Sequence, residues 1–176
     1  RLLEEYGWKK LNKSWIKKLN QMLEKPINNS LFGVLDCGGE GDCLFLCIIE
    51  AMKEHGEPGM DVENLRNLVA YEIDETNFDI ILETYKLEKE MGEFDGLWDP
   101  FQIKNIEDLR EQIRIPGDNF WGDHIIIQLL QNALKINIIL LSFENETHDD
   151  NNTNKIYRII STGSAMIYDK YIILYF

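Results

Sequence analysis

The chain has 176 residues, of which 18 are Lys or Arg and 31 are Asp or Glu, so its formal net charge is −13. This length suits one domain, and a composition with 44% hydrophobic and 28% charged residues is typical of a globular protein. The acidity excludes nucleic-acid binding through a general basic surface, because phosphate would be repelled. The apolar runs are far shorter than the ~20 residues that cross a bilayer, so we expect neither a membrane span nor a signal peptide.

The predicted elements begin with a basic amphipathic helix. Its apolar residues recur at helical spacing between lysines: Leu11, Trp15, Leu19, Met22 and Leu23. Residues 26–30 end it, so residues 1–30 are predicted to form an N-terminal helical extension. We expect its apolar stripe to pack against the rest of the protein, with a membrane-surface or partner-binding helix as the alternative.

The middle of the chain is acidic and predicted to be helical. Residues 36–123 carry 23 acidic and seven basic side chains. Apolar periodicity predicts helices over 43–55, 62–73, 78–85, 106–113 and 125–133. Asp61 and Asn105 stand where helix N-caps are expected.

Strands are predicted after the last helix. We expect a buried strand over 136–143, a polar hairpin loop over 144–154, a returning strand over 156–160 and a final strand over 171–176. Helices followed by strands favour an α+β fold, with a small central sheet flanked by helices. We predict a single domain over 1–176 whose sequence is cut at both ends.

Three cysteines lie close together in the sequence, at Cys37, Cys43 and Cys47. An odd number in so short a window is a poor disulfide framework, which favours a reducing, intracellular setting. With His55 they could be counted as four zinc ligands, but their spacing differs from the paired pattern of structural zinc sites. We therefore expect no metal and no cofactor, and interpret Cys37 and Cys47 as buried packing thiols.

Cys43 is the candidate nucleophile, because a glycine-rich loop over 38–41 leads into the helix that it begins. Unpaired N–H groups and the positive end of the helix dipole favour the thiolate there. The same N–H groups can stabilise the oxyanion that forms when a thiolate attacks a carbonyl. The alternative is a structural cysteine at a helix start.

The sequence around Cys43, Gly41-Asp42-Cys43-Leu44-Phe45, resembles the nucleophile motif of the ovarian-tumour (OTU) cysteine proteases. Further along, Trp121-Gly122-Asp123-His124 and the strand from Ile136 to Ile139 resemble the tryptophan-glycine turn and central strand of that family, in the same order. The resemblance covers roughly residues 30–176. It implies an OTU-type, papain-like cysteine protease fold.

The resemblance also implies a deubiquitinase, which hydrolyses isopeptide bonds at the C-terminus of ubiquitin or a ubiquitin-like modifier. Cys43 is then the nucleophile, and the loop 40–43, with Glu40, Gly41 and Asp42, is the oxyanion loop. The family usually has Asp where Glu40 stands. Backbone N–H groups matter more than the side chain for oxyanion stabilisation by that loop, so we expect Glu to be tolerated in place of Asp.

The histidine that would act as general base is expected just beyond Phe176, because the family's histidine follows a strand that residues 171–176 resemble. His55 ends the helix of Cys43, roughly 18 Å away at 1.5 Å per residue. His124 occupies a capping or packing position. His148, followed by acidic residues in the polar hairpin, is the less favoured candidate.

The expected partners are ubiquitin or a ubiquitin-like protein and polyubiquitin chains, bound by a monomer in the cytosol. Many Ile, Asn and Lys residues suggest an AT-rich genome, so the cytosol could be that of a host infected by a virus or bacterium. Acidic residues on predicted helices, Asp74, Glu75, Asp79 and Glu83, could attract the arginines of the ubiquitin tail. Alternatives are an inactive OTU-fold ubiquitin-binding module and another papain-like thiol hydrolase or transferase.

Overall fold

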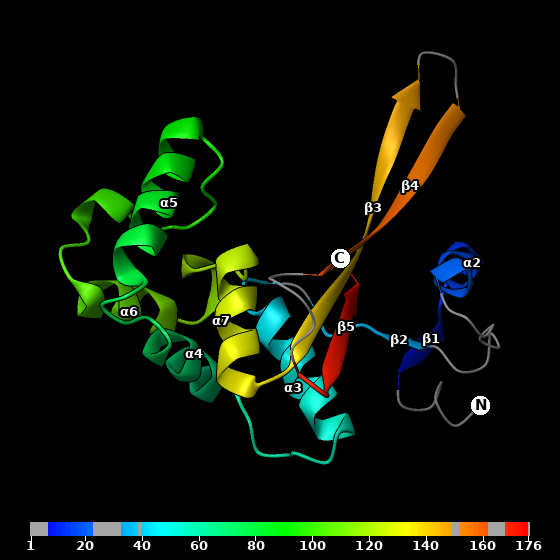
Figure 1. Ribbon diagram of the computed structural model, residues 1–176, viewed down its shortest axis with the longest axis horizontal. Coiled ribbons are helices and arrows are strands. Elements are labelled where there is room, and N and C mark those ends of the chain that lie inside the picture. The colour runs from blue at the N-terminus through cyan, green and yellow to red at the C-terminus, as the bar shows by residue number, and fades with distance from the viewer. Residues whose placement is uncertain (1–6, 23–32, 39, 149–151, 162–167, 176) are drawn as a thin grey trace. The chain divides into compact units, whose positions relative to one another are not determined.

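The computed structural model describes residues 7–22, 33–38, 40–148, 152–161 and 168–175 (Figure 1). The chain divides into two compact units. Unit 1 comprises Arg1–Asp36, Ile139–Ile160 and Ile173–Phe176, and unit 2 comprises Cys37–Ile138 and Ser161–Ile172. Among the described helices, none is long and apolar enough to cross a membrane. A single domain over the whole chain stays a prediction.

Unit 1 begins with a small antiparallel sheet that the sequence pattern did not predict. Strands β1 (Trp8–Lys10) and β2 (Gly33–Leu35) pair in the register Trp8 to Leu35. Each strand has three residues, too few to show a hydrophobic period.

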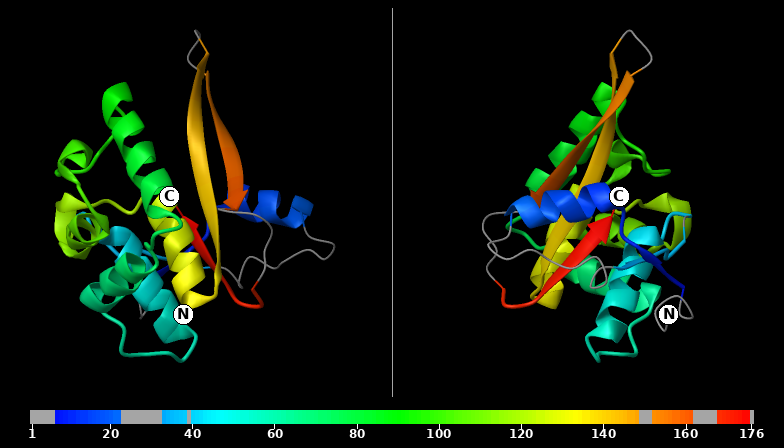
Figure 2. Two further views of the ribbon diagram at one scale, coloured as in Figure 1. Left: turned by 60° about the vertical axis from the view of Figure 1, so that its left-hand side comes forward. Right: turned by 90° about the vertical axis from the view of Figure 1, so that its right-hand side faces the viewer.

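The helix α2 (Lys13–Met22) confirms the predicted N-terminal helix and packs through its apolar side. Trp15 is fully buried in a cluster with Leu11, Ile16 and Leu141. The Trp15 and Tyr175 rings meet edge to face, with centroids 6.0 Å apart. Figure 2 shows α2 close to the C-terminal end of β4. The packing interpretation of the apolar stripe is therefore confirmed for Leu11 and Trp15, whereas the side chains of Leu19, Met22 and Leu23 lie outside the described part of the structure.

A three-stranded sheet has the order β4-β3-β5, from β3 (Asn137–His148), β4 (Asn152–Ser161) and β5 (Tyr171–Tyr175). The strand predictions are confirmed, but the polar hairpin loop over 144–154 is wrong. Strands β3 and β4 continue through most of that range as a long hairpin (Figure 1). The ladder is made by backbone N–H and C=O groups, so polar side chains do not end it.

Unit 2 contains five helices among its described residues, all predicted from the sequence: α3 (Cys43–Glu54), α4 (Val62–Tyr71), α5 (Phe78–Met91), α6 (Ile106–Arg114) and α7 (His124–Leu134). Two short 3₁₀ turns, η1 (Pro100–Gln102) and η2 (Gly117–Asn119), lie in the loops. The Asp61 side chain accepts from the Asn64 N–H, and that of Asn105 accepts from the Asp108 N–H, which confirms both predicted N-caps.

An aromatic cluster joins α5 to the loops on either side of α6. The Tyr85 ring lies 5.4 Å from that of Trp98 and 5.5 Å from that of Phe120, both edge to face. Trp98 and Phe120 stack at 5.2 Å. These contacts fix the segment that leads into the tryptophan-glycine turn.

Candidate active site

Cys43 is the first residue of α3, as predicted, and its side chain is partly exposed. The loop before it has an unusual backbone, because Gly38, Glu40 and Gly41 all have positive φ, at 91°, 69° and 56°. Left-handed φ is rare for residues other than glycine, so the exposed Glu40 is held in a conformation that L side chains seldom adopt. The Asp42 N–H donates to the Glu40 carbonyl, which closes a tight turn in front of the thiol.

Asp42 occupies the N-cap position of α3, but its side chain makes no capping hydrogen bond. The carboxylate instead pairs with Arg66, whose Nη2 and Nε lie 2.6 and 2.9 Å from Oδ1. Its other oxygen, Oδ2, accepts from the Gly117 N–H at 2.8 Å. The residue next to the candidate nucleophile is thus held from two sides by tertiary contacts.

Arg66 is completely buried, and sequence reasoning missed it. Beyond Asp42, its guanidinium donates to the carbonyls of Ile113 at 2.8 Å, Phe120 at 3.1 Å and Gly117 at 3.3 Å. It also lies over the Phe45 ring, 4.4 Å from the centroid. One signal was available, since Arg66 is three residues before Val69 and so falls on the apolar face of α4.

The Cys43 motif meets the segment 117–122, which ends in the tryptophan-glycine turn, through two glycines. A Cβ on Gly41 would lie 2.2 Å from the carbonyl carbon of Gly117, and one on Gly122 would lie 2.6 Å from Cβ of Leu44. No larger residue fits at either position without movement of the neighbouring segment. The tryptophan-glycine turn is therefore seated against the first turn of α3.

The second motif also provides a helix cap. The Asp123 side chain accepts from the Ile126 N–H and begins α7. Burial raises the pKa of this carboxyl, and burial also raises the pKa of Glu88, with the charge of Asp123 adding to that shift. His124 is the first residue of α7 and is exposed, so the prediction that it packs or caps is wrong: Asp123 is the cap.

The other histidines are far from Cys43 along the chain or outside the description. His55 is the C-cap of α3, at the opposite end of the helix from Cys43, as expected. His148 is the last residue of β3, not part of a loop, and its side chain lies outside the described part of the structure. The position expected for the general base, beyond Phe176, lies outside the sequence.

The remaining cysteines differ from their prediction. Cys37 and Cys47 are each partly exposed, so neither is a buried packing residue. Among the described residues, no group of three or more His, Cys, Asp or Glu side chains is arranged to hold a metal ion.

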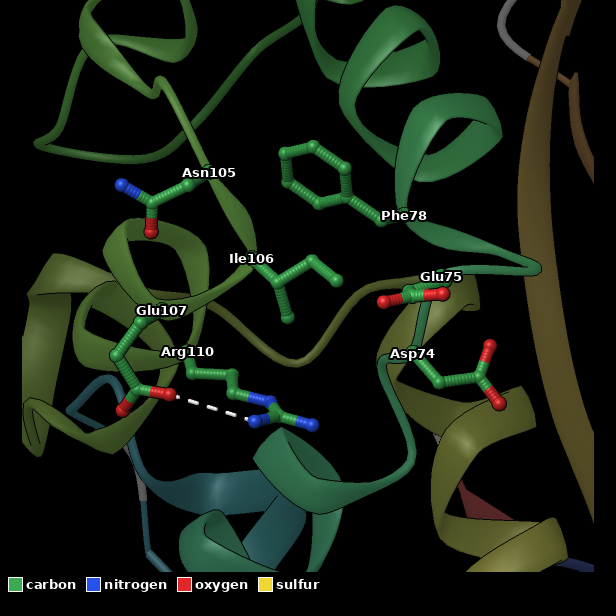
Figure 3. Close-up of a pocket in the computed structure, with 7 residues that line it drawn as sticks. All are labelled: Asp74, Glu75, Phe78, Asn105, Ile106, Glu107 and Arg110. Carbon is green, nitrogen blue, oxygen red and sulfur yellow. Dashed lines mark hydrogen bonds and ion pairs between the residues drawn. The ribbon is translucent and has the colours of Figure 1, made fainter.

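A hollow of about 590 Å³ lies on another part of unit 2, between the start of α5 and the start of α6 (Figure 3). Its lining comprises Asp74, Glu75, Phe78, Asn105, Ile106, Glu107 and Arg110. Asp74 and Glu75 were predicted on helices and lie instead in the turn between α4 and α5, whereas Asp79 and Glu83 are on α5. All four acidic side chains are exposed.

A model of the OTU-like cysteine protease family matches residues 38–176. The match includes the Cys43 motif, the tryptophan-glycine turn and all three strands of the larger sheet. Comparisons with curated proteins and with solved structures returned no significant match. The chain belongs to the OTU-like cysteine protease family, with the α+β fold of that family. Members of this family generally act on ubiquitin substrates.

We predict that Gly41→Ala destabilises the protein far more than Gly56→Ala. Both glycines have positive φ, but a Cβ at Gly56 meets nothing within 4 Å, whereas one at Gly41 collides with the Gly117 peptide. Strain alone costs about 1–2 kcal/mol, so the excess at Gly41 measures the collision. Urea denaturation of both variants checks this, and equal losses of unfolding free energy would contradict the close packing.

We also predict that the unfolding free energy of Asp123→Asn, measured relative to that of the wild type, increases as the pH rises. A carboxyl whose pKa is raised by folding favours the folded state at low pH and loses this stabilisation as the pH rises through its pKa. Asn keeps the acceptor for the Ile126 N–H and does not ionise. Unfolding free energies at about pH 4 and pH 7 measure the difference. Asp61→Asn, at an exposed cap, is the matched control and is expected to show a smaller change.

Proposed function

We propose that this protein is a deubiquitinase that cleaves the isopeptide bond between the C-terminus of ubiquitin, or of a ubiquitin-like modifier, and a lysine side chain. One observation carries the proposal. The chain belongs to the OTU-like cysteine protease family, and its partly exposed Cys43 begins α3 directly after a loop whose residues have left-handed backbone conformations. Single ubiquitins and polyubiquitin chains are both expected substrates.

The proposed reaction begins at the Cys43 thiolate. Its sulfur attacks the isopeptide carbonyl, and the resulting oxyanion is stabilised by N–H groups of the loop 40–43 and of the first turn of α3. The lysine amine leaves after it accepts a proton from a histidine, which leaves a thioester between Cys43 and the modifier. Water, activated by the same histidine, then hydrolyses the thioester and restores the thiol.

The loop residues have separate proposed parts in this reaction. Glu40 and Gly41 supply the left-handed turn, and Asp42 holds that turn to Arg66 and Gly117. Because the Asp42 N–H is used by the Glu40 carbonyl, the first N–H groups of α3 are left as the main oxyanion donors. Neither His55 nor His124 is assigned as the base.

We predict that a ubiquitin probe with a C-terminal electrophile labels the full-length protein at Cys43. Cys43→Ala should abolish labelling, because the sulfur forms the covalent bond. Cys47→Ala, which removes another partly exposed thiol one helical turn away, is the matched control and should leave labelling unchanged. A mass shift on a denaturing gel measures both. Labelling that survives in Cys43→Ala would contradict the proposal, and binding without labelling would favour an inactive ubiquitin-binding module.

We further predict that probe labelling slows as salt rises, at probe concentrations where association limits the rate. The arginines of the ubiquitin tail are attracted by the acidic segment 36–123, and salt screens this attraction over about 10 Å at 0.1 M. Alkylation of Cys43 by neutral iodoacetamide is the control and should not change with salt. A labelling rate that is equal at 50 and 300 mM salt would show that the acidic surface has no steering role.

A further inference from the structure

Asp42 is in the position from which aspartate normally caps a helix, yet it does not cap α3. An N-cap aspartate accepts a hydrogen bond from the second or third helical N–H, and Asp61, Asn105 and Asp123 all do so in this protein. Among the described helices of unit 2, α3 and α5 have no such side-chain bond at their N-caps, Asp42 and Asn77, and α3 is the helix that carries the candidate nucleophile.

The carboxylate of Asp42 is held away from the helix by the buried Arg66 and the partly buried Gly117. Arg66 donates hydrogen bonds to Oδ1 from two nitrogens, and the Gly117 N–H donates one to Oδ2. Arg66 cannot easily follow Asp42 elsewhere, because its guanidinium is also fixed by the carbonyls of Ile113 and Phe120 and by the Phe45 ring. The guanidinium is 0% exposed, so water does not compete for these bonds.

We propose that Arg66 is a positioning residue that keeps the first N–H groups of α3 available to Cys43, by preventing Asp42 from capping the helix. This inference rests on the proposed role of Cys43 as the nucleophile. Two effects follow from one contact. The N–H donors stay available to the thiolate and the oxyanion, and a negative charge is kept out of the first turn of the helix.

Loss of Arg66 frees Asp42 to do what an aspartate does at an N-cap. Its carboxylate would accept from the N–H of Leu44 or Phe45, which removes a donor from the site and brings a negative charge next to the thiol. Like charges repel, so the thiolate becomes less favourable. The loss of Cys43 reactivity in a variant without Arg66 should then be caused by the Asp42 carboxylate. Removal of that carboxylate should restore the reactivity.

The test compares Arg66→Gln with the double variant Asp42→Ala/Arg66→Gln. Alkylation of Cys43 by iodoacetamide at pH 7, followed by mass spectrometry of the Cys43 peptide, should be about tenfold slower in Arg66→Gln. The double variant should recover at least half of the wild-type rate. A purely structural role for Arg66 would leave the double variant as slow as the single one.

Arg110→Gln is the matched control for the loss of a structural arginine. Arg110 also donates to backbone carbonyls, those of Ala70 and Ile73, but it makes no contact with Asp42. It should lower the melting temperature without slowing alkylation of Cys43. If Arg66→Gln does not fold, Arg66→Lys and Asp42→Ala/Arg66→Lys replace it, since one ammonium cannot reproduce the contacts of the guanidinium.

The ubiquitin probe adds a second measurement. In the folded Arg66 variant, the maximal labelling rate should fall while the probe concentration at half-saturation stays the same, because the contacts with ubiquitin are not changed. Iodoacetamide requires no ubiquitin, so failure of the wild type to react with the probe would overturn only the proposed function. Three results would each overturn the role of Arg66. A folded Arg66 variant could be alkylated at the wild-type rate, the double variant could show no recovery, or Arg110→Gln could slow alkylation equally.

Discussion

The buried guanidinium of Arg66 is the constraint on which the rest of unit 2 depends. A buried charge is tolerated only where its hydrogen bonds are satisfied, and this one joins α4 to the cap of α3 and to the loop 113–120. Removal of one partner of such a buried pair costs about 3–5 kcal/mol, because the other charge is left without compensation. The contact therefore fixes how three segments, distant in sequence, approach one another.

The glycines are a consequence of this arrangement. Once Asp42 is bound to both Arg66 and Gly117, the backbone of Gly41 lies directly against the Gly117 peptide, where a side chain has no room. Gly122 meets Leu44 in the same way from the other motif. The two motifs of the OTU-like family are thus parts of one packed structure around the start of α3, although about eighty positions separate them in the chain.

This arrangement gives a physical account of how a cysteine at a helix start becomes a candidate nucleophile. Every helix leaves N–H groups unpaired in its first turn, and most of the helices in unit 2 use a side-chain cap to satisfy one of them. In α3 a tertiary contact holds the Asp42 carboxylate away from these N–H groups, which the proposed mechanism uses as oxyanion donors. The hydrogen bonds of Arg66 contribute the stability that a side-chain cap would otherwise give to α3.

Local signals in the sequence were sufficient for much of the fold. Apolar periodicity placed the helices, and Asp61 and Asn105 were identified as caps because capping depends on a few adjacent residues. Periodicity failed for the three-residue strands β1 and β2, and it ended the hairpin of β3 and β4 too early, because a backbone ladder leaves no apolar pattern. The interpretation of Cys37 and Cys47 as buried failed since residue type does not determine burial.

The sequence by itself determined the α+β class, the family motifs and the place of Cys43 at a helix start, since each of these is written in neighbouring residues. Only the tertiary structure decided what Asp42 does. Its side chain had two sets of partners, the adjacent N–H groups of α3 or the distant Arg66 and Gly117, and it is bound to the second set. An ion pair between the buried Arg66 and the partly buried Asp42, 24 positions apart, cannot be deduced from either residue's neighbours in the sequence.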